Sequence, residues 1–356
     1  MLKKLTDNWI EPFRSPVNAG RSVRNRLSIG LLGVILVGCN AENTIRVTGS
    51  VEGEPYEITV IHEGVSATVA SEVISQAEKK LKQHYELLAY SGDVIEKLNE
   101  DRVADVPAEF ENVAALAETI RNATEGAYDY RQAGVRDLWR FYNRNAKPPE
   151  VGELATALAD VPNTVLEVKN GKASLAGRGM IDFGLLAQGS AVDAAADALV
   201  AGGIPKAKIS LGQVVRTWGG KVDEGKNLWQ VILPPLPEDS VYKVLTPPDG
   251  SIAYIHPEII GLEVKDSVRA RMLDPFTGQL SDSAIASVGW ADEAAVAGAY
   301  AEAFFVMGRR NVFFWIEDHQ PAGAYLVYYS KFDEMMLCET DAHLANCLSD
   351  SLPLER

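Results

Sequence analysis

Residues 180–193 read Met-Ile-Asp-Phe-Gly-Leu-Leu-Ala-Gln-Gly-Ser-Ala-Val-Asp, and this stretch decides the fold. Its pattern predicts a short apolar strand at 180–183, a tight turn at 187–189 and an alanine-rich helix that ends near Val200. Small residues in such a turn let a backbone approach a ligand, and the N-terminus of the following helix offers unpaired N–H groups to an anion. The stretch therefore predicts a strand-turn-helix unit able to bind a ligand.

The same stretch resembles the core signature of the FAD:protein FMN transferases, the ApbE-like periplasmic lipoproteins. That signature reads approximately I-D-[LF]-[GS]-x-[IL]-A-K-G-[YF]-A-V-D. Four further segments follow in the family's order. They are Thr-Glu-Gly-Ala-Tyr-Asp at 124–129 with Leu-Trp-Arg-Phe at 138–141, Ile-Ser-Leu-Gly at 209–212, Leu-Asp-Pro-Phe-Thr-Gly at 273–278, and Ala-Gly-Ala-Tyr-Ala-Glu-Ala-Phe-Phe-Val-Met-Gly at 297–308.

The resemblance implies an α+β chain with the ApbE-like, T-fold-like mixed fold, in which helices pack on antiparallel sheets. The hydrophobic pattern predicts the individual elements independently. It predicts helices at 66–88, 106–123, 148–160 and 294–307, hairpins at 46–60 and 164–175, and strands within 207–264 and at 312–316 and 323–329. We expect three parts: a signal peptide at 1–39, a flavin transferase domain at 45–330 and a C-terminal tail at 331–356.

The first 39 residues have the features of a lipoprotein signal peptide. Basic residues precede an apolar run at 27–37, and Leu36-Val37-Gly38-Cys39 has the form of a lipobox. The run holds about eleven residues, too few to span a bilayer. We therefore expect lipidation of Cys39 and a periplasmic protein, attached only through its lipid to the inner or outer membrane of a Gram-negative bacterium.

Charge and cysteine content narrow the classes of partner. Without residues 1–38, which hold six basic and two acidic residues, the chain keeps 28 Lys and Arg against 47 Asp and Glu, a net charge of −19. Such a charge argues against binding to nucleic acid or to anionic membrane surfaces.

Cys338 and Cys347 are the other two cysteines, and two interpretations stay open for them: a disulfide in an oxidising compartment, or two unpaired thiols.

The resemblance also implies a reaction. Members transfer FMN from FAD to a threonine hydroxyl of a periplasmic redox protein in a Mg²⁺-dependent step, and AMP leaves. Phosphoryl transfer of this kind needs a metal or cations to neutralise phosphate charge and a base for the hydroxyl. The resemblance therefore implies FAD as substrate, Mg²⁺ as metal and an FMN-accepting redox protein as partner.

The family's functional positions carry over to particular residues of this chain. Those implied for flavin binding are Asp129, Asp182, Ala187, Gln188, Gly189 and Gly212; those implied for catalysis are Asp274 and Arg271; those implied for the metal are Gly298 and Glu302. Asp182, Asp193 and Asp274 retain the family's carboxylates. A structural interpretation stays open for each of the three, because aspartates also cap helices and hold turns.

Several implied positions depart from the family. Gln188 replaces the lysine of A-K-G, which removes a cation that would pair with phosphate. Gly298 stands at the metal aspartate of A-D-A-L-S-T, and Glu302 at its threonine; glutamate supplies an oxygen ligand that Mg²⁺ accepts, whereas glycine supplies none. Arg271 replaces a histidine. Restoring Lys at 188 and Asp at 298 together is predicted to raise activity more than either change alone, because metal and cation act on the same phosphate charge.

Other departures lie beyond the signature and the metal positions. The family's G-G-D turn is here Gly212-Gln213-Val214, Ser190 replaces an aromatic residue, and Glu52-Gly53-Glu54 replaces a methionine-glycine-threonine segment. The two glutamates place negative charge where the dinucleotide would lie, and that charge would repel a pyrophosphate.

Two hypotheses follow from these departures. The first is an FAD:protein FMN transferase with reduced activity. The second is a catalytically inactive flavin- or protein-binding lipoprotein on the same scaffold, and the altered metal and phosphate positions favour it. Under both hypotheses, the segments at 181–193 and 298–302 are expected to line one cleft.

Overall fold

The computed structural model describes residues 43–141, 148–223, 226–227, 229–233, 243–245, 249–257, 261–264, 267–319, 322–329 and 335–340. All of them belong to one unit of the chain, Gly33–Arg356. In chain order the elements are β1 (Thr44–Val51), β2 (Glu54–Ile61), α1 (Ala67–Leu88), α2 (Asp93–Asp101), β3 (Val103–Asp105), α3 (Ala108–Ala123), α4 (Ala133–Leu138), α5 (Val151–Asp160), η3 (Val161–Asn163), β4 (Val165–Lys169), β5 (Lys172–Ala176), α6 (Leu185–Ala201), β6 (Lys206–Leu211), β7 (Val214–Trp218), β8 (Lys221–Asp223), β9 (Lys226–Asn227), β10 (Val231–Leu233), β11 (Lys243–Leu245), β12 (Gly250–Ile255), β13 (Gly261–Val264), β14 (Ser267–Ala270), β15 (Ala286–Ala291), α8 (Ala294–Asp318), β16 (Gly323–Tyr329) and β17 (Met335–Thr340).

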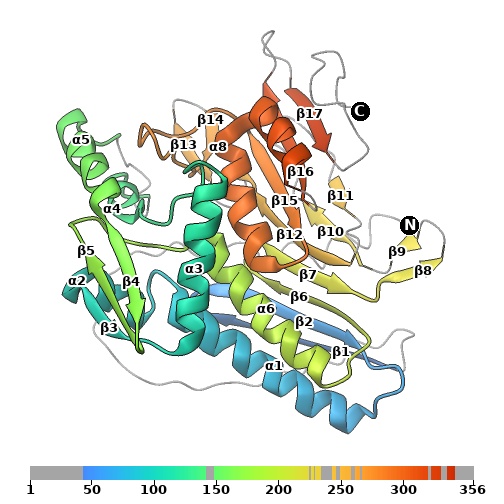
Figure 1. Ribbon diagram of the computed structural model, residues 1–356. Helices are drawn as coiled ribbons and strands as arrows, with labels where there is room; N and C mark the ends of the chain where they lie inside the picture. The colour runs from blue at the N-terminus through green and yellow to red at the C-terminus, as the bar shows by residue number, and fades with distance from the viewer. Residues whose placement is uncertain are drawn as a thin grey trace. The chain divides into compact units, whose positions relative to one another are not determined.

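The main sheet has eight strands in the order β1-β2-β6-β7-β12-β15-β16-β17. Each strand in it pairs antiparallel with its neighbours. Figure 1 shows α1, α6 and α8 lying across one face of this sheet, with α6 in contact with both of the others. A smaller sheet, β3-β5-β4, belongs to the part of the chain that carries α2, α4 and α5. The predicted α+β fold with antiparallel sheets is confirmed.

Helix α1 shows why the sequence folds as it does. Ser66 caps its N-terminus, where the Ser66 hydroxyl accepts a hydrogen bond from the backbone N–H of Val69 at 3.3 Å. The buried residues of the helix recur at helical spacing and face the core. They are Ala70, Val73, Ile74, Ala77, Leu81, Tyr85 and Leu88.

Helices α6 and α8 approach each other closely because glycines face across their interface. A Cβ added at Gly189 would lie 2.1 Å from the carbonyl oxygen of Ala294, and one added at Gly298 would lie 2.4 Å from the carbonyl oxygen of Leu185. No side chain fits at either position without movement of the opposite backbone. The two glycines therefore fix how near α8 lies to the start of α6.

Two predicted elements are wrong. Residues 187–189 form no turn: Ala187, Gln188 and Gly189 lie inside α6, which already begins at Leu185. Gly184, with φ of 58°, makes the break that the prediction placed three residues later. The predicted strand at 180–183 is only an isolated bridge between Met180 and Gln132.

The predicted strand at 312–316 is also wrong, because these residues continue α8. Their β-branched and aromatic composition is typical of a strand. Val312 and Ile316 are nevertheless four residues apart and both buried, which is the spacing of one helix face. Gly308, with φ of 65°, interrupts the helix between the predicted part and this extension.

Among the described residues, no helix combines the length and the apolar character that crossing a membrane requires. Cys39 and Cys347 lie outside the described residues, and the backbone of Cys338 lies in β17. Lipidation at Cys39 and a disulfide between the other two cysteines therefore stay predictions.

Candidate functional site

The core signature and α8 meet at the start of α6. The backbone N–H of Leu185 donates to Glu302 Oε1 at 2.7 Å, and the N–H of Gly184 donates to Asp182 Oδ1 at 2.8 Å. A Cβ at Gly184 would lie 2.3 Å from Glu302 Oε1, so the glutamate lies directly against the turn. The structure thus brings Asp182 and Glu302 together at one helix N-terminus.

Glu302 is an unusual carboxyl group. Burial raises its pKa to about 7, and the nearby Asp182 carboxylate adds to the rise, while the Leu185 N–H and the Arg136 guanidinium oppose it. Near neutral pH, a substantial fraction of Glu302 is therefore protonated. A protonated carboxyl is a poor ligand for a divalent cation.

Asp182 has a partner that the sequence did not single out. Its carboxylate forms an ion pair with Arg136 of α4, and that guanidinium lies over the Tyr90 ring, 5.1 Å from its centroid. The Tyr90 hydroxyl donates to Asp137 Oδ2 at 2.5 Å. Nothing in the pattern around Arg136 indicated this role, because the pair joins segments far apart in the sequence.

Gln188 and Gln213 form a neutral, buried pair. Gln188 Oε1 accepts from the backbone N–H of Gln213 at 3.0 Å, and Gln188 Nε2 donates to Gln213 Oε1 at 3.2 Å. The two residues are 6% and 7% exposed. Gly212 has φ of 53°, and a Cβ there would lie 2.5 Å from Gln188 Oε1, so only glycine fits beside the pair. The family's lysine position is thus occupied by a hydrogen-bonded amide.

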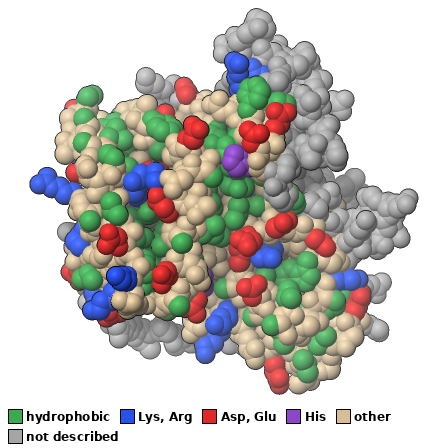
Figure 2. Space-filling view, in the orientation of Figure 1, with side chains coloured by type: hydrophobic (Ala, Val, Ile, Leu, Met, Phe, Trp, Pro, Cys, Tyr) green, Lys and Arg blue, Asp and Glu red, His purple; other side chains and the backbone are tan. Residues whose placement is uncertain are grey.

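Two glutamates lie in the segment that contacts Gly212, next to this amide pair. The Gly212 N–H donates to the carbonyl of Pro55 at 2.9 Å, which places the turn between β1 and β2 beside Gly212. Glu52 lies in that turn, and Glu54 is the first residue of β2. Burial raises the pKa of Tyr85, and the carboxylates of Glu54, Asp182 and Glu52 raise it further, against a hydrogen bond with Gln188. Figure 2 shows acidic side chains at several places on the face of the protein seen in Figure 1.

Asp129 is held by a neighbouring arginine. Its carboxylate accepts from Arg131 Nε at 2.8 Å and from Arg131 Nη2 at 2.6 Å, a bidentate pair, and also from the Arg131 backbone N–H at 3.0 Å. The segment with Asp182 lies beside Asp129, since the Asp182 N–H donates to the carbonyl of Tyr130 at 2.7 Å. Asp129 therefore borders the site with its oxygens already hydrogen-bonded.

Asp274 shapes its own loop. Asp274 Oδ1 accepts from the Phe276 N–H at 2.8 Å, and the Gly278 N–H donates to the Asp274 carbonyl at 2.7 Å. Trp139 Nε1 donates to the Gly278 carbonyl at 2.8 Å, which ties the loop to the residues after α4. These contacts support the structural interpretation of Asp274. Arg271 follows β14, where burial lowers its pKa, and its catalytic role stays a prediction.

The residues present do not fit Mg²⁺. Gly298 offers no ligand and no room for one, because the Leu185 carbonyl fills the space. The Oε1 atom of Glu302 already accepts the Leu185 N–H. Within the part of the chain that the structure describes, no three His, Cys, Asp or Glu side chains gather as a metal site.

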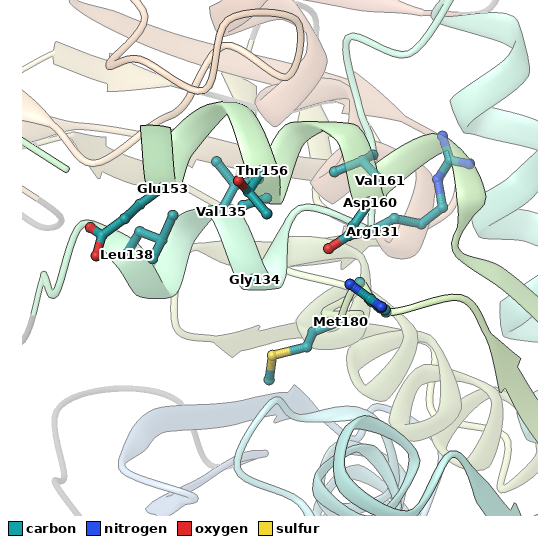
Figure 3. A pocket seen from close by; sticks show the side chains of 12 residues that line it. Arg131, Gly134, Val135, Leu138, Glu153, Thr156, Asp160, Val161 and Met180 are labelled. Carbon is teal, nitrogen blue, oxygen red and sulfur yellow. The ribbon is translucent and has the colours of Figure 1, made fainter. Parts of the chain in front are cut away.

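A pocket of about 400 Å³ lies between α4 and α5, close to the site. Figure 3 shows Leu138 and Glu153 at one end, Arg131 and Asp160 at the other, and Met180 below and between them. Two of the residues that line this pocket lie two positions along the chain from site residues: Met180 from Asp182, and Arg131 from Asp129. None of the residues implied for flavin or metal binding lines it.

Comparison with known proteins identifies the family. The family model described as "ApbE family" matches residues 53–326. The fold is similar to the flavin transferase ApbE from Vibrio cholerae (19% identity, TM-score 0.67, covering 83% of this chain and 97% of that chain). It is also similar to the apo form of the flavinyl transferase ApbE from Pseudomonas stutzeri (19% identity, TM-score 0.69, covering 83% of this chain and 94% of that chain). A third similar structure is the ApbE protein from Thermotoga maritima (21% identity, TM-score 0.66, covering 82% of this chain and 96% of that chain). Among curated proteins there is no match. The family match covers most of the chain, and the chain therefore belongs to the ApbE family.

Proposed function

We propose that this protein binds a flavin nucleotide beside Asp182, Gln188 and Gly212, and transfers FMN from FAD to a threonine of a periplasmic redox protein at a much reduced rate. The observation that carries the proposal is the convergence of the signature residues at the N-terminus of α6, with a neutral amide pair at the lysine position. Family membership supports flavin transfer, and the altered residues support the reduced rate.

The reaction shows what the substitutions remove. The threonine oxygen forms a bond to the FMN phosphorus, the bond from that phosphorus to the bridging oxygen breaks, and AMP leaves with the oxygen while the hydroxyl proton passes to a base. Negative charge develops on the phosphate oxygens, which preorganised cations stabilise. Gln188 offers only a neutral amide at the lysine position, so this position supplies no cation for that stabilisation.

AMP release from FAD tests the proposal. Purified protein is incubated with FAD, with and without Mg²⁺, and AMP is separated and quantified over hours. We expect slow release, far below a typical enzymatic rate of about 1 s⁻¹. Release at that rate or faster would show that the substituted site is fully competent.

A second candidate is a flavin- or protein-binding member that transfers nothing. The packing of Gly298 against Leu185 favours it, since this close contact leaves no space for a metal-binding side chain. Flavin binding without any AMP release above that of buffer would support this candidate over slow transfer. Covalent flavin on a threonine-containing acceptor, detected by mass spectrometry, would exclude it.

We also propose that the protein is a periplasmic lipoprotein. The lipobox ending at Cys39, after a basic and then an apolar segment, supports the proposal. Labelled palmitate is expected to enter the protein in a Gram-negative host and to be absent from a Cys39→Ser variant. Incorporation that survives this substitution would contradict the assignment of Cys39.

A further inference from the structure

We infer that this site discriminates against flavin phosphates and takes an uncharged flavin, of which riboflavin is the simplest, in preference to FMN and FAD. The inference rests on the proposed flavin-binding function and names the ligand class that the same site favours. It depends on three features of the described residues: a neutral centre, paired cations and unpaired carboxylates.

The described residues at the centre of the site, Gln188 and Gln213, are neutral. Gln188 is buried, and its amide is engaged on both sides by Gln213. A neutral amide hydrogen-bonds a carbonyl or an imide N–H as well as it does a phosphate oxygen, so it gives an anion no advantage. A lysine at this position would have favoured phosphate by its charge.

Three arginines among the described residues near the site already have carboxylate partners. Arg136 pairs with Asp182, Arg131 with Asp129, and Arg216 with Asp193. Asp129 is 6% exposed and Arg131 is 13% exposed at the side chain, so this pair in particular is closed to solvent. A phosphate would have to displace a carboxylate from one of these arginines, and the displaced carboxylate would then lie unpaired beside it.

Two carboxylates at the site lack such partners. Glu52 accepts a hydrogen bond from Ser91 Oγ at 3.0 Å. Burial raises the pKa of Glu54, which weakens its charge, so Glu52 carries the larger share of the negative charge. Among the described residues, no Lys or Arg forms an ion pair with Glu52 or Glu54. The residue after Glu54, Pro55, accepts a hydrogen bond from the Gly212 N–H, which places the start of β2 against Gly212. The surplus charge is therefore negative where a flavin would lie.

The size of the effect follows from Coulomb's law. Two like unit charges about 4 Å apart in water weaken binding by about fivefold, and more where the protein lowers the dielectric constant. FMN and FAD each carry about two negative charges near neutral pH. With two carboxylates at the rim, we expect riboflavin to bind at least about tenfold more tightly than FAD at low ionic strength.

The test is a set of fluorescence titrations of the intact protein with riboflavin, FMN and FAD, without divalent cations. Riboflavin is expected to bind most tightly, and its advantage is expected to shrink in 0.5 M salt, about the level at which exposed charges are screened over a few ångströms. In a Glu52→Gln, Glu54→Gln variant, the ratio of riboflavin to FAD affinity is expected to fall about tenfold. A control with Glu111→Gln and Glu167→Gln, two exposed glutamates outside the site, is expected to keep the wild-type ratio.

The outcomes separate the inference from the proposed function. FAD or FMN that binds as tightly as riboflavin would overturn the inference and leave flavin binding intact. A ratio unaffected by both salt and the paired substitution would also overturn it. If none of the three flavins binds, the proposed function fails, and the inference fails with it.

Discussion

The carboxylate of Glu302 on α8 accepts a 2.7 Å hydrogen bond from the backbone N–H of Leu185, the first residue of α6. The first N–H groups of a helix have no partner within the helix, and a carboxylate there is favoured by the helix dipole. Glu302 therefore acts as a cap supplied by another helix. The family resemblance implies a metal ligand at position 302, but in this chain Glu302 joins α8 to the start of α6.

The burial of Glu302 predicts a pH dependence of stability, because burial raises its pKa while the hydrogen bond from the Leu185 N–H only opposes that rise. The pKa of Glu302 lies near 7 in the folded protein, against 4.5 for an unperturbed glutamate. The folded state binds the proton of Glu302 more tightly than the unfolded state does. The stability that this proton contributes is therefore fully present below about pH 4.5 and is lost as the pH rises through about 7. The upper limit of that loss is about 3 kcal/mol. Urea denaturation at pH 5 and pH 8 measures it.

Glu302→Gln provides the control for this prediction. Glutamine keeps an oxygen acceptor for the Leu185 N–H and cannot titrate. Its free energy of unfolding is expected to change less between pH 5 and pH 8 than that of the wild type. Equal pH dependence in the two proteins would show that other groups cause it, among them Asp193, whose pKa is also raised by burial.

Gly298→Asp is predicted to destabilise the protein. The sequence alone suggested that this substitution would restore a metal ligand. The Cβ itself would meet the Leu185 carbonyl at 2.4 Å, so α6 and α8 must move apart. We expect a loss of about 3 kcal/mol or more, with Gly298→Ala nearly as harmful as the aspartate, because the first added carbon causes the clash.

Gly152→Ala is the matched control for Gly298. Gly152 also lies in a helix, α5, but a Cβ there meets nothing within 4 Å. It is expected to be neutral or to stabilise by up to about 1 kcal/mol. Thermal melts of the three variants provide the comparison, and a Gly298→Ala variant as stable as Gly152→Ala would contradict the packing argument.

The fold was largely predictable from local patterns. Ser66 and the apolar spacing behind it predicted α1, and the Asn170-Gly171 pair predicted the hairpin of β4 and β5. The predictions failed where the decisive contact was distant. Gly189 suggests a turn by its residue type, but it lies inside α6. Glycine is needed there because the Ala294 backbone across the interface leaves no room for a side chain.

The site was predictable in its members but not in its contacts. The resemblance named Asp182, Gln188 and Glu302, and the structure places these at one end of α6. It did not indicate Arg136 or Tyr90, because their link to Asp182 joins three segments through side chains alone. The amide pair of Gln188 with Gln213 likewise depends on a contact between residues 25 positions apart.

Gln188→Lys is predicted to trade stability for phosphate affinity. The Gln213 N–H would lose its buried acceptor, at a cost of about 1–3 kcal/mol. The new cation would raise FAD affinity relative to riboflavin by about fivefold or more. Gln188→Met removes the same hydrogen bonds without adding charge, so it should lose similar stability and leave the affinity ratio unchanged. A ratio altered equally in both variants would rule out a charge effect.

Asp193→Ala is predicted to be among the most destabilising substitutions on α6. Its two carboxylate oxygens accept from the N–H groups of Ala294 and Ala295, each at 2.9 Å, and it pairs with Arg216. These contacts support the structural interpretation of this aspartate. Removing it leaves two N–H groups at the start of α8 and one partly buried arginine without an acceptor, a loss of about 3–5 kcal/mol.

Two further variants show whether that loss comes from the cap and the ion pair. Asp193→Asn keeps one oxygen acceptor and removes the charge, so we expect a loss intermediate between wild type and Asp193→Ala. Asp197→Ala removes an exposed carboxylate four residues along the same helix, and its effect should stay within about 0.5 kcal/mol. Urea denaturation at pH 7 ranks the variants. If Asp193→Ala and Asp197→Ala are equally stable, Asp193 contributes nothing to holding α6 against α8.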